Sequence, residues 1–180
     1  WYGRLAHDTE LRCLGWAVDT WFKPGGSLVD LPCGTGRLLT AYGDRFDVTG
    51  VDISNAMLDV ARNRFAANPR FKFQAGDAEK LPFPDNSFDY LVSFRLMCHL
   101  PREVRIRVLC EMARVTRKTL VVNYHFDVRS PLMLFNRLFR KSAANLPYPL
   151  RERDLGAELA GCPVALMATR KLSWYERSSA

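Results

Sequence analysis

The stretch of sequence that decides the fold reads Val29-Asp30-Leu31-Pro32-Cys33-Gly34-Thr35-Gly36-Arg37. It continues the apolar, β-rich run over residues 27–31, which predicts a buried strand. Gly34 and Gly36 follow this strand, and glycine permits both a tight turn and a close approach of the backbone to a ligand. The sequence therefore predicts a strand, a glycine turn and then a helix over about residues 36–42.

Outward from this stretch, short β-rich runs alternate with helical stretches, which is typical of βαβ units and a parallel sheet. Further strands are predicted over residues 46–51, 70–74, 88–94, 119–124 and 164–168. Helices are predicted over residues 54–66, with Ser54 as the N-cap, after Pro101, and over residues 153–160. We therefore predict an α/β fold with a doubly wound, mostly parallel sheet, in a single domain over residues 1–180.

The composition excludes several classes of protein. Apolar residues make up 48% and charged residues 25% of the 180 residues, which is typical of soluble globular proteins. The apolar runs are much shorter than the roughly 20 residues that a membrane-spanning helix needs. The five cysteines have no CxxC spacing and stand far in sequence from the three histidines, which argues against a metal site and against a disulfide framework. Free thiols favour a cytoplasmic protein.

The net charge of +7 is concentrated in one part of the chain. Residues 101–153 contain 12 Lys and Arg against 4 Asp and Glu, whereas the rest of the chain is nearly balanced. Such an excess can attract nucleic acid, anionic lipid or an acidic small molecule, or it can simply form a solvated basic surface.

Three successive predicted strands each end at an aspartate: Asp30, Asp52 and Asp77. In doubly wound sheets, ligands bind beyond the carboxyl ends of the strands. Asp30 is placed to accept a hydrogen bond from a cationic amine, and Asp52, 22 residues further on, to bind both ribose hydroxyls of an adenosine ligand. Asp77 is placed to accept a hydrogen bond from an adenine amino group. This arrangement is far more specific than a single glycine motif.

Segments 30–36, 48–58 and 76–89 resemble the signature of the class I S-adenosylmethionine-dependent methyltransferases. The resemblance covers about residues 25–125 and is closest to the type 11-like group that contains the ubiquinone/menaquinone C-methyltransferases. It implies a Rossmann-like fold and S-adenosylmethionine as cofactor, with S-adenosylhomocysteine as product. It also implies a cofactor-binding part over about residues 1–125 and a substrate-side, C-terminal part over about residues 126–180.

The resemblance implies that Asp30 and Gly34 face the methionine part of the cofactor and that Asp52 binds the ribose. The full set of implied cofactor-binding residues is Asp30, Pro32, Gly34, Gly36, Asp52, Ile53, Met57, Asp77, Ala78 and Phe94. Two features depart from the family pattern. Pro32 stands where the family usually has glycine, which removes one N–H donor, and no seventh strand is predicted after residue 168.

Methyl transfer requires a general base only where the acceptor loses a proton. Candidates for a base or a positioning group are Arg95, His99, Tyr124 and His125, which stand at or just after the end of the fourth or fifth predicted strand. Each also has an ordinary structural reading, as a hydrogen-bonded residue or a surface ion pair. The basic amphipathic segment 130–141 is interpreted as a roof over a hydrophobic substrate, as a core helix, or as a peripheral membrane contact.

We therefore predict methyl transfer to a small-molecule acceptor that is lipid-like, quinone-like or anionic. An RNA or protein methyltransferase is the alternative that the basic stretch supports, but Ser93-Phe94-Arg95-Leu96 stands where amino-methylating enzymes have an Asn-Pro-Pro-Tyr-type tetrapeptide. An inactive S-adenosylmethionine-binding module is a further alternative. A nicotinamide dehydrogenase is disfavoured because Leu39 occupies the place of the third glycine in its motif.

Overall fold

The computed structural model describes residues 2–124 and 154–167. Within these residues one all-parallel sheet has the strand order β3-β2-β1-β4-β5. The strands are β1 (Ser27–Asp30), β2 (Asp47–Asp52), β3 (Phe71–Ala75), β4 (Phe88–Ser93) and β5 (Thr116–Val122). Because β1 lies between β2 and β4, the order reverses there, and the switch point is at the carboxyl ends of β1 and β4.

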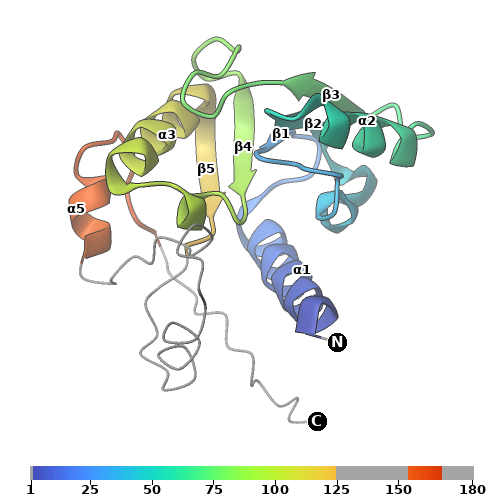
Figure 1. Ribbon diagram of the computed structural model, residues 1–180, viewed down its shortest axis with the longest axis horizontal. Helices are drawn as coiled ribbons and strands as arrows, with labels where there is room; N and C mark the ends of the chain where they lie inside the picture. The colour runs from blue at the N-terminus through green and yellow to red at the C-terminus, as the bar shows by residue number, and fades with distance from the viewer. Residues whose placement is uncertain (1, 125–153, 168–180) are drawn as a thin grey trace, which may run out of the picture.

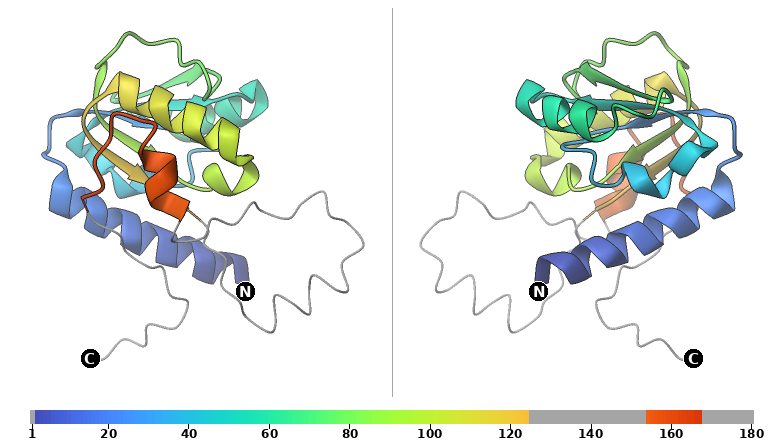
Figure 2. Two further views of the ribbon diagram at one scale, coloured as in Figure 1. Left: turned by 90° about the vertical axis from the view of Figure 1, so that its left-hand side faces the viewer. Right: turned by 90° about the vertical axis from the view of Figure 1, so that its right-hand side faces the viewer.

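Helices cover both faces of the sheet, as a doubly wound fold requires (Figures 1 and 2). The helix α1 (Tyr2–Trp21) lies across one face, and α3 (Arg102–Val115) and α5 (Leu155–Leu159) lie on the other. The helix α2 (Asn55–Arg64) packs on β2 and β3, and its predicted N-cap Ser54 accepts a hydrogen bond from the backbone of Met57. No helix among the described residues is long and apolar enough to cross a membrane.

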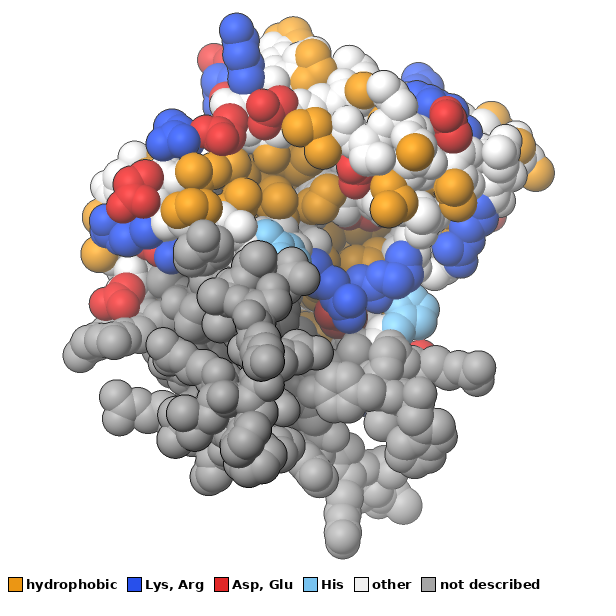
Figure 3. Space-filling model, in the orientation of Figure 1, with side chains coloured by type: hydrophobic (Ala, Val, Ile, Leu, Met, Phe, Trp, Pro, Cys, Tyr) orange, Lys and Arg blue, Asp and Glu red, His pale blue; other side chains and the backbone are white. Residues whose placement is uncertain are grey.

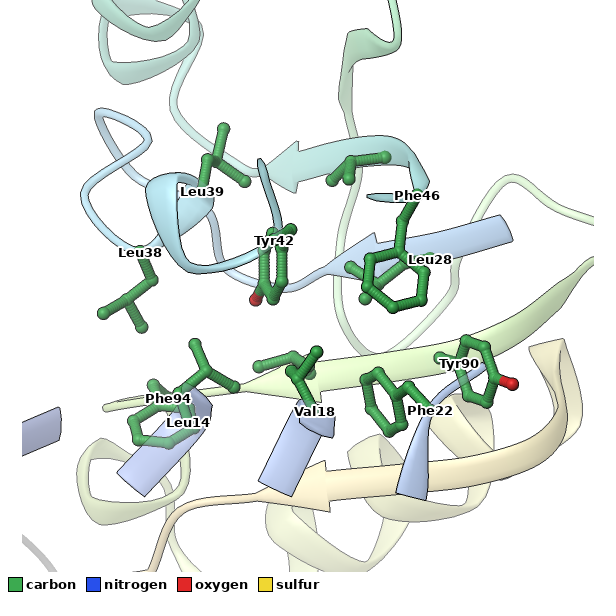
Figure 4. Packing of buried hydrophobic residues seen from close by; sticks show 12 residues of the cluster. Leu14, Val18, Phe22, Leu28, Leu38, Leu39, Tyr42, Phe46, Tyr90 and Phe94 are labelled. Carbon is green, nitrogen blue, oxygen red and sulfur yellow. The ribbon is translucent and has the colours of Figure 1, made fainter. Parts of the chain in front are cut away.

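The position of α1 follows from one apolar stripe along the helix. Leu14, Val18 and Phe22 recur every four residues and are buried against the sheet (Figure 4). Phe22 stacks on Tyr90 near the start of β4, whereas Leu14 lies beside Phe94 just beyond its end. The helix therefore runs antiparallel to β4, and its N-terminal half reaches the carboxyl ends of the strands.

The opposite face holds a second apolar core, in which α3 contributes the stripe that its sequence predicts. Val108, Met112 and Val115 are fully buried against the strands. The same helix carries the buried Arg105, whose guanidinium pairs with the Glu158 carboxylate of α5, with Nη2 and Oε1 2.5 Å apart. Because both charges are buried, this ion pair fixes α5 on α3 rather than acting as a surface contact.

The prediction of a helix over residues 36–42 is wrong. Two short 3₁₀ helices stand there instead, η1 (Leu39–Ala41) and η2 (Gly43–Arg45). Gly36 and Gly43 have φ angles of +75° and +55°, which lie outside the right-handed helical region. The turns between them are closed by hydrogen bonds between residues three apart in the chain, so no full α-helical turn forms.

The C-terminal part also differs from the prediction in two respects. The predicted sixth strand over 164–168 is irregular in its described part, residues 164–167, because this stretch pairs with no strand. The prediction of free thiols is wrong for one pair, since Cys110 of α3 and Cys162 form a disulfide. Folding brings their Cα atoms to 5.0 Å although 52 positions separate them in the chain. The other three cysteines form no disulfide.

Candidate functional site

The loop after β1 contains two glycines with different roles. Gly34 has a φ of +54°, and a Cβ added to it would meet no atom within 4 Å, so its outer side faces open space. Gly36 has a φ of +75°, and an added Cβ would lie 2.6 Å from the Phe65 ring. Gly34 thus leaves room for a ligand, whereas Gly36 is needed for packing. Pro32 lies half-buried in the same loop, after a cis peptide bond.

Asp52, at the end of β2, holds this loop in place. Its Oδ2 accepts a hydrogen bond from the Gly34 N–H at 2.8 Å, and its Oδ1 accepts one from the Ser54 N–H at 2.9 Å. The carboxylate is buried, with 7% of the residue exposed. Each carboxylate oxygen can accept a second hydrogen bond, so Asp52 can orient the loop and still bind a hydroxyl.

Apolar and polar groups continue from Asp52 along this rim of the sheet. Ile53 and Met57 are 75% and 47% exposed, which leaves two large apolar side chains free to cover a flat ring. The end of β3 is next to the end of β2, because Gly76 donates its N–H to the Asp52 carbonyl. Asp77 is exposed and caps a turn by accepting the Glu79 N–H at 2.9 Å, and the neighbouring Ala78 packs on the second core.

Asp30, at the end of β1, is buried, with 2% of the residue exposed. Burial raises the pKa of its carboxyl to about 8, while the Tyr42 hydroxyl and the Arg37 guanidinium lower it and the charge of Asp52 raises it. The Tyr42 hydroxyl has no partner among the described residues at full hydrogen-bonding geometry. The Asp30 carboxyl is thus mostly protonated at neutral pH, and a nearby cation would favour its charged form.

Three of the predicted site residues, Phe94, Arg95 and His99, follow β4. Phe94 is a predicted cofactor contact, and its side chain packs in the first core, because it lies on the same face of β4 as Tyr90 and Val92. Arg95 is half exposed and has a φ of +61°, which is rare for a residue with a side chain and costs about 1–3 kcal/mol. His99 is exposed in η3 (Met97–His99).

His125 and the segment 130–141 lie outside the described residues, so their predicted roles stay predictions.

A cluster of charges that sequence reasoning missed connects α1 to the site. The Glu10 carboxylate accepts Arg95 Nε on Oε1 at 2.7 Å and contacts Arg37 Nη2 through Oε2 at 2.8 Å. His7 Nδ1 lies 2.8 Å from Arg37 Nη1. A signal for Glu10 exists in the sequence, since it stands four residues before Leu14 in the apolar stripe of α1, where a carboxylate is out of place.

Unpaired polar atoms also gather at the ends of β4 and β5. Ser93 Oγ, Asn123 Oδ1 and the Tyr124 hydroxyl are buried and have no hydrogen-bond partner among the described residues. The backbone N–H of Asn123 donates to the Ser93 carbonyl, which keeps the two strand ends together. Burial raises the pKa of Tyr124 to about 12, so its hydroxyl stays a hydrogen-bond donor. Buried atoms of this kind are candidates for contacts with a ligand.

The space-filling view shows a hollow in this face of the molecule (Figure 3). Hydrophobic side chains line it, and Lys and Arg side chains lie along its edge. Among the described residues, no group of three or more His, Cys, Asp and Glu side chains could hold a metal ion.

Comparison with known proteins agrees with this geometry. A family model described as a methyltransferase domain matches residues 28–119, which include all but the first residue of β1, the whole glycine loop, and β2 to β4. The chain belongs to this methyltransferase family. Membership confirms the predicted class I fold and the predicted cofactor, S-adenosylmethionine.

Two curated relatives and one solved structure illustrate the similarity. The chain is 37% identical to a phosphatidylethanolamine N-methyltransferase of Cereibacter sphaeroides over 114 residues, 60% of this chain and 55% of that protein. It is 33% identical to a demethylmenaquinone methyltransferase of Lysinibacillus sphaericus over 135 residues, 71% of this chain and 57% of that protein. The chain thus spans a little over half the length of these two relatives.

The solved structure is magnesium protoporphyrin IX methyltransferase of Synechocystis PCC 6803 with bound S-adenosylhomocysteine. It shares the fold with a TM-score of 0.72 at 20% identity, over 87% of this chain and 72% of that one.

The residues of this methyltransferase fit its cofactor. The open side of Gly34 leaves room for it, the Asp30 carboxyl suits a cationic amine, and the Asp52 carboxylate suits vicinal hydroxyls. The exposed Ile53 and Met57 side chains suit a flat aromatic ring. When bound, S-adenosylmethionine supplies an electrophilic methyl group on a sulfonium.

Proposed function

We propose that this methyltransferase transfers a methyl group from S-adenosylmethionine to a small-molecule acceptor that is lipid-like, quinone-like or anionic. The observation that carries this proposal is the site at the switch point, where the buried Asp30 and Asp52 flank the open Gly34. The relatives named as phosphatidylethanolamine and demethylmenaquinone methyltransferases support a small hydrophobic acceptor.

We assign the cofactor contacts by their position in the site. Asp30 and Gly34 face the methionine part, and Asp52 binds the ribose. Ile53, Met57, Asp77 and Ala78 surround the adenine, Pro32 and Gly36 shape the loop, and the backbone of Phe94 borders the methyl group. Arg95, His99 and His125 are proposed for the acceptor side.

The work of the protein in this reaction is alignment. In-line displacement needs the acceptor atom behind the methyl group and little water around it. The glycine loop, held by Asp52, fixes the cofactor end, and the helix α1 closes the same edge of the sheet through Glu10. A base such as His99 is needed only for an acceptor that must lose a proton.

The alternative of an RNA or protein acceptor receives less support. Residues 101–124 contain six of the basic side chains that make the second half of the chain basic, and five of them are in ion pairs. These pairs are Arg105 with Glu158, Arg107 with Glu79, Arg114 with Glu111 and Asp85, and Arg117 and Lys118 with Asp89. Charges that are already compensated attract a polyanion weakly.

The cytoplasm remains the proposed compartment. Three cysteines that form no disulfide support it, whereas the disulfide between Cys110 and Cys162 counts against a strongly reducing compartment.

Calorimetric titration with S-adenosylmethionine tests the proposal. We expect micromolar binding by the wild type and a loss of about 100-fold or more in Asp52→Ala, which removes the ribose acceptor and the anchor of Gly34. Asp47→Ala is the matched control, because Asp47 lies at the other end of β2 and is exposed. Absence of binding by a folded wild type would exclude a methyltransferase and leave an inactive member of the family.

A further inference from the structure

We infer that Arg95, held in place by Glu10, binds a carboxylate or phosphate group of the methyl acceptor. The inference rests on the proposed function and narrows its acceptor to an anionic one.

The first support is the geometry of the Arg95 side chain. Among the residues that the structure describes, only its Nε is engaged, by Glu10 Oε1 at 2.7 Å. Neither Nη atom has a hydrogen-bond partner among the described residues, although the side chain is only 46% exposed. The two Nη groups lie in one plane and match the paired oxygens of a carboxylate or phosphate. Because the guanidinium is already held at Nε, its two Nη groups can bind a ligand with little further loss of side-chain conformational entropy.

The second support is the balance of charge around Glu10. Its single carboxylate is shared between the guanidiniums of Arg95 and Arg37, so the cluster carries a net positive charge. Arg37 uses one Nη on Glu10 and the other on His7 Nδ1, which commits it to α1. Arg95 therefore keeps both of its Nη groups for a ligand, whereas each Nη group of Arg37 already has a partner.

The third support is the place of Arg95 in the sheet. It stands three residues beyond Val92, which pairs with Asp30 across β4 and β1. The backbone turns into the left-handed region at Arg95, and unfavourable conformations of this kind are concentrated at functional sites. An anion held here lies at the switch point, beside the proposed methionine end of the cofactor.

The test uses n-octyl phosphate below its micelle concentration as the probe, titrated into protein saturated with S-adenosylhomocysteine. Inorganic phosphate and n-octyl glucoside are titrated in parallel, to separate a lipid-like anion from a free one and from a neutral amphiphile. The variants are Arg95→Gln, which removes the charge, and Arg95→Lys, which keeps the charge but loses the fork. The matched control is Arg45→Gln, since Arg45 also pairs with a carboxylate of α1, that of Asp19.

We expect octyl phosphate to bind the wild type and Arg45→Gln alike, and to bind Arg95→Gln about tenfold or more weakly, with Arg95→Lys in between. Equal binding of inorganic phosphate would support the same site with a free anion as its ligand. Equal binding of octyl phosphate and octyl glucoside, or unchanged affinity in Arg95→Gln, would overturn the inference. Failure of the wild type to bind S-adenosylhomocysteine would instead refute the proposed function.

Thermal unfolding of each variant separates a lost contact from a lost fold. Arg95→Gln breaks a partly exposed ion pair and is expected to lose no more stability than Arg45→Gln. If Arg95→Gln unfolds far more easily than the control, Arg95→Lys decides, because it keeps the ion pair with Glu10. If a stable Arg95→Lys protein binds octyl phosphate more weakly than the wild type does, the result supports recognition through the two Nη groups. If it binds octyl phosphate with wild-type affinity, the result overturns the inference.

Discussion

Asp30→Asn is expected to stabilise the free protein while weakening its cofactor binding. Burial raises the pKa of the Asp30 carboxyl from 3.8 to about 8. The unfolded chain therefore releases this proton near pH 4, whereas the folded protein keeps it until about pH 8. Between these values the folded state binds more protons, so the free energy of unfolding falls as the pH rises.

The size of this effect follows from the two pKa values. Each pH unit between them changes the free energy of unfolding by about 1.4 kcal/mol. At pH 7 the buried carboxyl destabilises the fold by about 4 kcal/mol relative to a pH below 4, where both states are protonated. Asparagine has the same shape and does not titrate, so the Asp30→Asn protein does not have this pH-dependent loss of stability.

Urea unfolding of both proteins at pH 5, 6, 7 and 8 measures the difference directly. The stability advantage of Asp30→Asn over the wild type should grow by roughly 1 kcal/mol per pH unit across this range. Asp47→Asn, at an exposed position of β2, should give a wild-type profile. Parallel pH profiles for wild type and Asp30→Asn would refute the reasoning, because they would mean that the Asp30 carboxyl ionises as freely in the fold as outside it.

Three further predictions follow from the same site and core. The cofactor amine should draw the Asp30 carboxyl into its charged form, so binding of S-adenosylmethionine at pH 7 should release close to one proton from the wild type and none from Asp30→Asn. Calorimetry in two buffers of different ionisation enthalpy measures this proton release. Gly36→Ala should lower the free energy of unfolding by about 2–4 kcal/mol, since its Cβ would clash with a ring, whereas Gly34→Ala should cost only about 1 kcal/mol and yet weaken cofactor binding. Glu158→Gln should cost about 3–5 kcal/mol in urea unfolding because it removes the buried carboxylate charge that pairs with the Arg105 guanidinium. Arg107→Gln, in an exposed pair, should cost less than about 1 kcal/mol.

The sequence predicted those features that depend on local pattern. Strand positions followed from apolar runs, the cap at Ser54 from its place before a helix, and the buried face of α3 from residues at helical spacing. The ends of β1 and β2 could be placed in one site because parallel strands bring their carboxyl ends to one edge of the sheet.

The features that the sequence did not show depend on contacts between distant residues or on backbone angles. Glu10 and Arg95 are 85 positions apart, and Cys110 and Cys162 are 52 apart, so no spacing rule brings either pair together. The missing helix after the glycine loop depends on the φ angle of Gly36, which residue type permits but does not fix.

The helix α1 joins the stability of the fold to its function. Glu10, Leu14 and Val18 stand four residues apart on one side of this helix, and Phe22, directly after its end, continues the series. Three of them are apolar and lie against the sheet, and the stripe becomes charged where the helix reaches the carboxyl ends of the strands. A carboxylate buried there without a counter-ion would cost several kcal/mol. The guanidinium of Arg95 offsets this cost and is itself oriented by the contact, so one ion pair both completes the packing of α1 and fixes the donor group that the acceptor meets.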